Sequence, residues 1–216
     1  DRALADLVVL AFFFLLRVGE YTPSGTRTTR TTQIRRKDMQ FWRKLPNGLM
    51  GRISPLATPA DLLEATAVTI TLDNQKNGQR DAVLHHDSIP NNPLCPCKAA
   101  ARRFIQMRLC APTDANAILS LYAPGKHVSA TQMAGVIRVA ALRSMVWLQG
   151  YDLSRIGPHS LRASGAMQLK LNGASDSMIQ KMGRWSSNTW LQYLHGQISC
   201  LTSGLSARMA TPVMYF

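Results

Sequence analysis

Residues 157–162 read Gly157-Pro158-His159-Ser160-Leu161-Arg162. Gly-Pro interrupts the chain and favours a helix start, so we predict a helix from His159 to Leu171 with His159 in its first turn. His159 and Arg162 are three residues apart and therefore share one helix face. A helix N-terminus offers free backbone N–H groups and partial positive charge, which suit a phosphate. The dipole and the arginine also favour the neutral imidazole, the form that accepts a proton.

The flanking sequence predicts a mainly helical protein with one small antiparallel sheet or hairpin, an α+β fold in a single domain over residues 1–216. Apolar periodicity predicts helices over residues 3–20, 97–109, 129–148 and 175–182, and a short one around Tyr193. Residues 67–72 alternate and are rich in β-branched side chains, Asn77-Gly78 is a tight-turn signal, and residues 81–85 supply a return strand. Lys76 lies at or next to the tip of this hairpin.

The charge balance points to a polyanionic partner. Lys and Arg number 25 against 12 Asp and Glu, which gives a formal charge of +13 and a pI near 10.3. Such an excess repels itself unless it meets a polyanion, most commonly nucleic acid. Between Arg27 and Lys44 stand seven basic residues and one acidic residue, in a stretch that begins as an exposed Thr/Arg-rich loop, residues 26–32. Solvated loop and phosphate contact are both open for this stretch.

The four cysteines do not make a disulfide scaffold in a chain of 216 residues, so reduced thiols and an intracellular setting are expected. Cys95 and Cys97, with His85 and His86 nearby, can be read as half a zinc site. The C-x-C spacing is unusual for zinc, however, and Cys-Pro-Cys-Lys favours a helix entry with proline in its first turn. The apolar residues 7–16 are too few to span a bilayer.

Further elements stand in a fixed order around the His-x-x-Arg box. Arg17 precedes Glu20 by three residues, Lys76 lies on the hairpin, Gly183-Arg184-Trp185-Ser186-Ser187 follows the box, and Tyr193 comes last. In this order the chain resembles the catalytic domain of the tyrosine recombinase (phage integrase-like) family. The Gly-Arg-Trp-Ser-Ser wording is most similar to recombinases of eukaryotic mobile elements such as Crypton and DIRS-type retroelements, which would imply a nuclear location.

The resemblance implies a site-specific DNA recombinase or integrase that works through a covalent 3′-phosphotyrosyl intermediate. Tyr193 would be the nucleophile, Lys76 the general acid for the leaving 5′-oxygen, and His159 the proton acceptor for the tyrosine. Arg17 and Arg162 would hold the non-bridging phosphate oxygens, because a guanidinium stays charged and bonds two oxygens at once. This set needs no metal, cofactor or ATP, and the sequence offers no carboxylate cluster for magnesium. The catalytic residues expected are Arg17, Lys76, His159, Arg162, Trp185 and Tyr193.

Two positions depart from the simple pattern. Counting back from Tyr193 places Arg184 where many family members have histidine, whereas Trp185 lies one place later and can donate its indole N–H to a phosphate oxygen. We assign the role to Trp185, since some members use tryptophan there, and keep Arg184 as the alternative. Glu20 is expected to orient Arg17 or to brace neighbouring helices. Lys37 and Lys44 also lie in candidate strands and are alternatives to Lys76.

The partner expected is double-stranded DNA, bound by a homo-tetramer in the synaptic complex and by a monomer or weak oligomer otherwise. Residues 194–216 are expected to form a tail that docks on a neighbouring protomer. The chain opens without methionine, so we expect a fragment that lacks the family's N-terminal DNA-clamping domain. The competing interpretations are a type IB topoisomerase, disfavoured because no serine- and lysine-rich linker precedes the tyrosine, and a non-catalytic DNA-binding remnant of a mobile element.

Overall fold

A computed structural model of the chain describes residues 2–23, 31–74 and 80–197, with side chains up to Gln192. Most of the predicted loop at 26–32, the hairpin tip with Lys76, and residues 198–216 of the predicted tail therefore lie outside the described residues. The same holds for the Tyr193 side chain. None of the helices in the described ranges is both long enough and apolar enough to cross a membrane.

The described residues form a four-stranded antiparallel sheet in the order β2-β1-β3-β4. β3 (Ala67–Asn74) pairs with β4 (Arg80–Asp87), which confirms the predicted hairpin. A candidate strand was expected at Lys44, which ends β1 (Met39–Lys44), whereas the bounds of β1 and the three-residue β2 (Met50–Arg52) were not predicted. A second small sheet joins β5 (Leu121–Ala123) to β6 (Lys126–His127).

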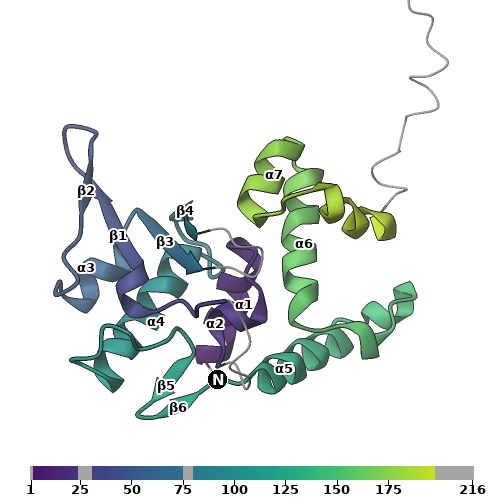
Figure 1. The fold of residues 1–216 in the computed structure, drawn as a ribbon, viewed down its shortest axis with the longest axis horizontal. Helices are drawn as coiled ribbons and strands as arrows, with labels where there is room; N and C mark the ends of the chain where they lie inside the picture. Colours follow the sequence, from purple (N-terminus) through teal and green to yellow (C-terminus); the bar gives the residue numbers. More distant parts are fainter. Residues whose placement is uncertain (1, 24–30, 75–79, 198–216) are drawn as a thin grey trace, which may run out of the picture.

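Helices cover the sheet and build out from it (Figure 1). α4 (Pro96–Cys110) packs on the sheet through an edge-to-face contact of Phe104 with Phe41, whose ring centroids lie 5.3 Å apart. α1 (Arg2–Phe13) packs on α4 and on α6 (Pro158–Leu171), and α6 carries α7 (Asp176–Gly183) and the 3₁₀ segment η4 (Asn188–Gln197) at its far end. α4, α6 and α7 lie within a few residues of their predicted ranges. The remaining short elements are α2 (Val18–Tyr21), α3 (Pro59–Leu63), η1 (Arg36–Asp38), η2 (Val146–Gln149) and η3 (Leu153–Arg155).

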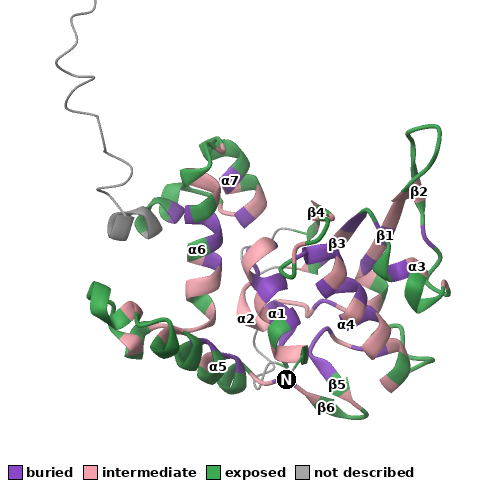
Figure 2. Ribbon diagram, turned by 180° about the vertical axis from the view of Figure 1, so that it is seen from behind, coloured by how far each residue is buried: buried purple, intermediate pink, exposed green. Residues whose placement is uncertain are grey.

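Two groups of buried apolar side chains lie under these layers. The larger joins α1, the sheet and α4, and its buried members include Leu7, Leu10, Val68, Ile70 and Met107. The smaller, made of Ala166, Ile179 and Trp190, holds α6, α7 and η4 together. Figure 2 shows the buried segments concentrated in α1, β3 and α4, whereas much of α5 (Ala130–Arg143) and η2 is exposed.

The prediction of one helix over residues 3–20 was wrong, because α1 ends at Phe13 and α2 starts only at Val18. Leu15 adopts a left-handed conformation with φ of 48°. The Leu16 N–H donates to the Ala11 carbonyl at 3.0 Å and the Leu15 N–H to the Phe12 carbonyl at 3.4 Å. This is a Schellman turn, which usually places glycine at the left-handed position, so the sequence gives no sign of it.

The predicted helix over residues 129–148 also ends early. α5 stops at Arg143, and Met145 has φ of 54°, a left-handed conformation that turns the chain into η2. The apolar periodicity continues through this break, which explains the overlong prediction. Apolar side chains beyond the break are largely exposed; they include Met145, Trp147 and Leu148.

The cysteine pair starts α4, as one of the two sequence interpretations predicted. Cys95 is the N-cap residue and Pro96 occupies the first turn. The Cys97 thiol donates to the His86 carbonyl at 3.3 Å, and burial raises the pKa of that thiol to about 12. Among the described residues, no three side chains of His, Cys, Asp or Glu are grouped so that they could hold a metal ion.

Gly165 sets how closely α6 approaches the end of α1. A Cβ at this position would lie 2.5 Å from the Phe12 carbonyl oxygen and 2.5 Å from the Leu15 side chain. Only glycine therefore lets the two helices meet at the Leu15 turn. That close approach matters for the site, because α6 also carries His159 and Arg162.

We expect Gly165→Ala to lower the free energy of unfolding by about 1–3 kcal/mol, the usual cost of overpacking. Gly135→Ala in α5 is the matched control, because an added Cβ there meets nothing within 4 Å. That change should raise the free energy of unfolding by about 0.4–1 kcal/mol, since alanine restricts the unfolded chain. Urea denaturation measures both, and equal effects of the two substitutions would contradict the close packing of α6 on α1.

Candidate active site

The first turn of α6 presents the His-x-x-Arg box as predicted. Gly157 is the N-cap residue and Pro158 begins the helix, so His159 lies in the first turn. His159 is exposed and Arg162 is buried. Partial desolvation, then the nearby guanidiniums of Arg162 and Arg17, lower the pKa of His159 below its ordinary value. This shift favours the neutral imidazole, the form that can accept a proton.

Arg162 joins three segments that are far apart in the sequence. Its guanidinium donates to the Leu15 carbonyl at the end of α1 and to the Gly183 carbonyl at the end of α7. The Trp185 ring packs on the same guanidinium, with 4.3 Å from Cζ to the ring centroid. Bonds to two carbonyls and a stacked indole fix the plane of this guanidinium.

Arg17 is held by Glu20 at the start of α2. Its backbone N–H donates to Oε2 of Glu20 at 2.8 Å, and its Nη1 donates to Oε1 at 3.1 Å. The Glu20 side chain is fully buried, whereas that of Arg17 is 26% exposed. Glu20 thus makes the contact with Arg17 that was expected of it, and the Arg17 side chain remains partly exposed.

Arg184 is buried and contacts Glu20 from the interior of the protein. Its Nη2 donates to Oε2 of Glu20 at 2.8 Å, and its guanidinium also donates to the carbonyls of Phe14 and Leu15, each at 3.2 Å. The side chain is only 1% exposed. Burial lowers the pKa of Arg184, and Arg17 lowers it further, while the Glu20 carboxylate opposes both. Arg184 therefore faces the protein interior, a role that the sequence did not suggest.

A turn at the end of α7 sends the side chains of Arg184 and Trp185 in different directions. Arg184 is left-handed with φ of 57°, and the Trp185 N–H donates to the Gln180 carbonyl at 3.0 Å. This second Schellman turn directs residue 184 toward Glu20 and residue 185 over Arg162. Gly183 permits it, because a Cβ there would overlap the Trp185 ring.

The structure brings together four of the six residues predicted for catalysis: Arg17, His159, Arg162 and Trp185. They come from the start of α2, the first turn of α6 and the end of α7. Lys76 lies outside the described residues, between the paired ends of β3 and β4. The backbone of Tyr193 belongs to η4, which packs on α6, but its side chain is outside the described part of the chain. The positions of the lysine and the phenol in the site stay predictions.

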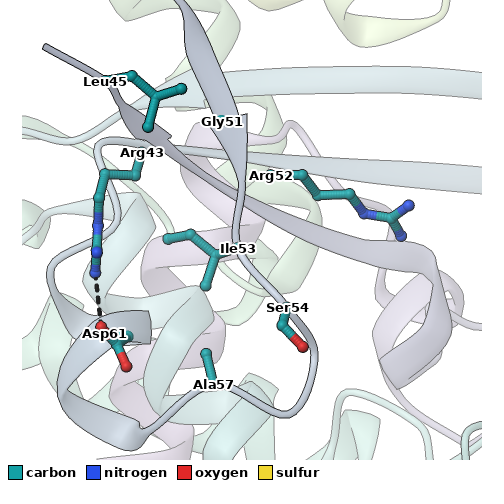
Figure 3. Close-up of a pocket in the computed structure, with 8 residues that line it drawn as sticks. All are labelled: Arg43, Leu45, Gly51, Arg52, Ile53, Ser54, Ala57 and Asp61. Atoms are coloured by element: carbon teal, nitrogen blue, oxygen red, sulfur yellow. Dashed lines mark hydrogen bonds and ion pairs between the residues drawn. The ribbon is translucent and has the colours of Figure 1, made fainter.

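A separate hollow of about 290 Å³ lies between β2 and α3 (Figure 3). It is lined by Arg43, Leu45, Gly51, Arg52, Ile53, Ser54, Ala57 and Asp61. Arg43 donates to Asp61 at 2.8 Å, and Figure 3 shows Arg52 directed away from that pair. The hollow contains none of the predicted catalytic residues, so the candidate site remains at the junction of α1, α2, α6 and α7.

Solved structures share this arrangement of elements. No protein-family model and no curated protein matches the sequence. The XerH site-specific recombinase, bound to palindromic difH substrate in a post-cleavage complex, matches with a TM-score of 0.54 at 16% identity. The match covers 95% of this chain and 46% of that one. The chain has the fold of the tyrosine recombinase catalytic domain.

Another structure in the comparison is the Tn1549 transposon integrase in complex with transposon right end DNA. It has a TM-score of 0.48 at 15% identity, over 95% of this chain and 58% of that one. This chain thus spans about half the length of the solved proteins. The recombinase fold confirms the predicted fold class, including its small antiparallel sheet.

We expect Gly183→Ala to lower the free energy of unfolding by about 1–3 kcal/mol, because the new methyl group displaces the Trp185 ring from Arg162. The cost should nearly vanish in a Trp185→Ala background, where the space is empty. A double-mutant cycle measured by urea denaturation should therefore give a coupling energy of about 0.5–3 kcal/mol. Additive effects would show that the ring does not occupy the space above Gly183.

Proposed function

We propose that this protein is a site-specific DNA recombinase or integrase that cleaves and rejoins DNA through a 3′-phosphotyrosyl bond to Tyr193. The observation that carries the proposal is the meeting of Arg17, His159 and Arg162 at one place in the fold. These residues are far apart in the sequence and match, in order, the boxes of the tyrosine recombinases. The DNA bound in the XerH and Tn1549 complexes is consistent with a DNA substrate.

In the proposed cleavage step the Tyr193 phenol oxygen attacks the scissile phosphorus and the bond from phosphorus to the 5′-oxygen breaks. His159 accepts the phenol proton, and Lys76 donates a proton to the leaving 5′-oxygen. Arg17 and Arg162 stabilise the extra negative charge on the non-bridging oxygens, and Trp185 donates its indole N–H to one of them. The reverse step, with the 5′-hydroxyl of another strand, reseals the DNA without ATP, because the phosphotyrosine conserves the bond.

The finer parts of the proposal concern assembly and origin. We propose a tetramer on DNA, in which residues 194–216 of one protomer dock on the next. The size of the protein–DNA complex by gel filtration tests this, and a complex of one protomer per site at saturation would contradict it. The Gly-Arg-Trp-Ser-Ser element supports an origin in a eukaryotic mobile element, and with it a nuclear location.

The central test is a suicide DNA substrate with a nick next to the cleavage point, which traps the covalent intermediate. The wild-type chain should form a protein–DNA adduct that withstands SDS, and Tyr193→Phe should form none, because it lacks the nucleophilic oxygen. An adduct with Tyr193→Phe would reject Tyr193 as nucleophile. DNA binding without any wild-type adduct would favour the non-catalytic remnant, and relaxation of supercoiled DNA without strand exchange would favour a type IB topoisomerase.

Lys76 has its own test. Lys76→Ala should slow adduct formation by about 100-fold or more, the usual range for loss of a general acid. The rate should recover on DNA whose leaving 5′-oxygen is replaced by sulfur, because a thiolate leaves without protonation. Lys37→Ala and Lys44→Ala are the matched controls and should cleave both substrates like the wild type. Recovery of one of these variants instead of Lys76→Ala would transfer the acid role to that lysine.

A further inference from the structure

We propose that Arg184 is a positioning residue that sets both phosphate-binding arginines, through Glu20 and the turn at Phe14 and Leu15. The proposal rests on the recombinase function above, and it assigns to Arg184 a different role from phosphate contact. Arg184 acts on groups that in turn hold Arg17 and Arg162.

The first connection runs through Glu20. Oε2 of Glu20 accepts from the Arg17 backbone N–H and from Nη2 of Arg184, both at 2.8 Å. This leaves Oε1 directed at Nη1 of Arg17, 3.1 Å away. Because the carboxylate is fully buried, it needs charged partners to offset its loss of hydration, and Arg184 supplies one from the interior side. Without it the carboxylate would lose the orientation that fixes Arg17.

The second connection runs through the Leu15 turn. The Leu15 carbonyl accepts from Nη2 of Arg184 and from Nη1 of Arg162. One oxygen therefore fixes the relative position of these two guanidiniums. Arg184 also donates to the adjacent Phe14 carbonyl, so it binds two successive carbonyls of the turn from the protein interior.

The geometry suits arginine in particular. A guanidinium has five donors in a rigid plane, so it can serve Glu20 and two carbonyls at once, which a lysine ammonium reaches less well. The left-handed backbone at residue 184 aims the side chain inward. Arg184→Lys should therefore restore the charge beside Glu20 but only part of the positioning.

The experiment compares single-turnover adduct formation by the full chain at saturating DNA, which isolates the chemical step from binding. Arg184→Met should slow this step by about 100-fold, the scale expected for a small misplacement of catalytic groups, with little change in the Kd for DNA. Arg184→Lys should lie between it and the wild type. Arg103→Met is the matched control, because Arg103 is equally buried and also donates to two carbonyls, those of Leu119 and Leu121, away from the site.

A substrate with a methylphosphonate at the scissile position separates positioning from general destabilisation. Its neutral phosphorus centre lacks the charge that Arg17 and Arg162 stabilise, so the defects of Arg17→Met and Arg184→Met should shrink together on it. A loss of fold would affect both substrates equally. The double variant Glu20→Met/Arg184→Met leaves no buried charge unpaired and should fold, yet it should cleave slowly because Arg17 has lost its carboxylate.

Wild-type rates for Arg184→Met or for the double variant would overturn the proposal, as would a defect of Arg184→Met that persists unchanged on methylphosphonate. A wild-type chain that forms no adduct would instead refute the recombinase function. In that case the NMR signal of the Arg17 guanidinium still tests the positioning. It should show faster proton exchange with water in Arg184→Met than in Arg103→Met, and equal exchange in the two would overturn the proposal.

Discussion

The carbonyl of Leu15 is the acceptor on which the candidate site depends. The chain must leave the helical conformation here for the oxygen to face two arginines, and a left-handed leucine costs roughly 1–2 kcal/mol. Hydrogen bonds from charged donors contribute about 1.5–3 kcal/mol each, which is enough to offset that cost. The turn and the arginines thus stabilise each other: Arg162 and Arg184 hold the end of α1, and the end of α1 holds them.

This arrangement concentrates positive charge around a single carboxylate. Arg17 and Arg184 are paired with Glu20, Arg162 shares the Leu15 carbonyl with Arg184, and Arg17 lowers the pKa of both Arg184 and His159. The folded protein therefore tolerates a repulsion that a bound phosphate would relieve. In the proposed reaction, groups fixed in this way would need no reorganisation as negative charge develops on the phosphate, and such preorganisation is a main source of electrostatic catalysis. Partial desolvation, helped by this repulsion, also lowers the pKa of His159, which favours the neutral imidazole that can accept a proton.

The sequence predicted the parts of the fold that carry local signals. Gly-Pro before His159, the Asn-Gly turn after β3 and the proline at the start of α4 each fix an element from within a few residues. The end of α1 has no such signal, because a leucine takes the place of glycine and its partners lie 147 and 169 residues away. A prediction from apolar periodicity alone therefore continued that helix to residue 20, beyond its end at Phe13. The bounds of β1 were not predicted for a related reason, since they are set by hydrogen bonds to β3, a segment distant in the sequence.

After Gly183, backbone geometry distinguishes the roles of Arg184 and Trp185, which spacing from Tyr193 alone cannot do. By spacing from Tyr193, Arg184 stands where histidine is common in the tyrosine recombinases. In space, the left-handed turn at residue 184 sends its guanidinium to Glu20 and brings Trp185 over Arg162. In the proposed reaction the indole N–H of Trp185 donates to the phosphate, whereas the Arg184 guanidinium binds Glu20 in the interior.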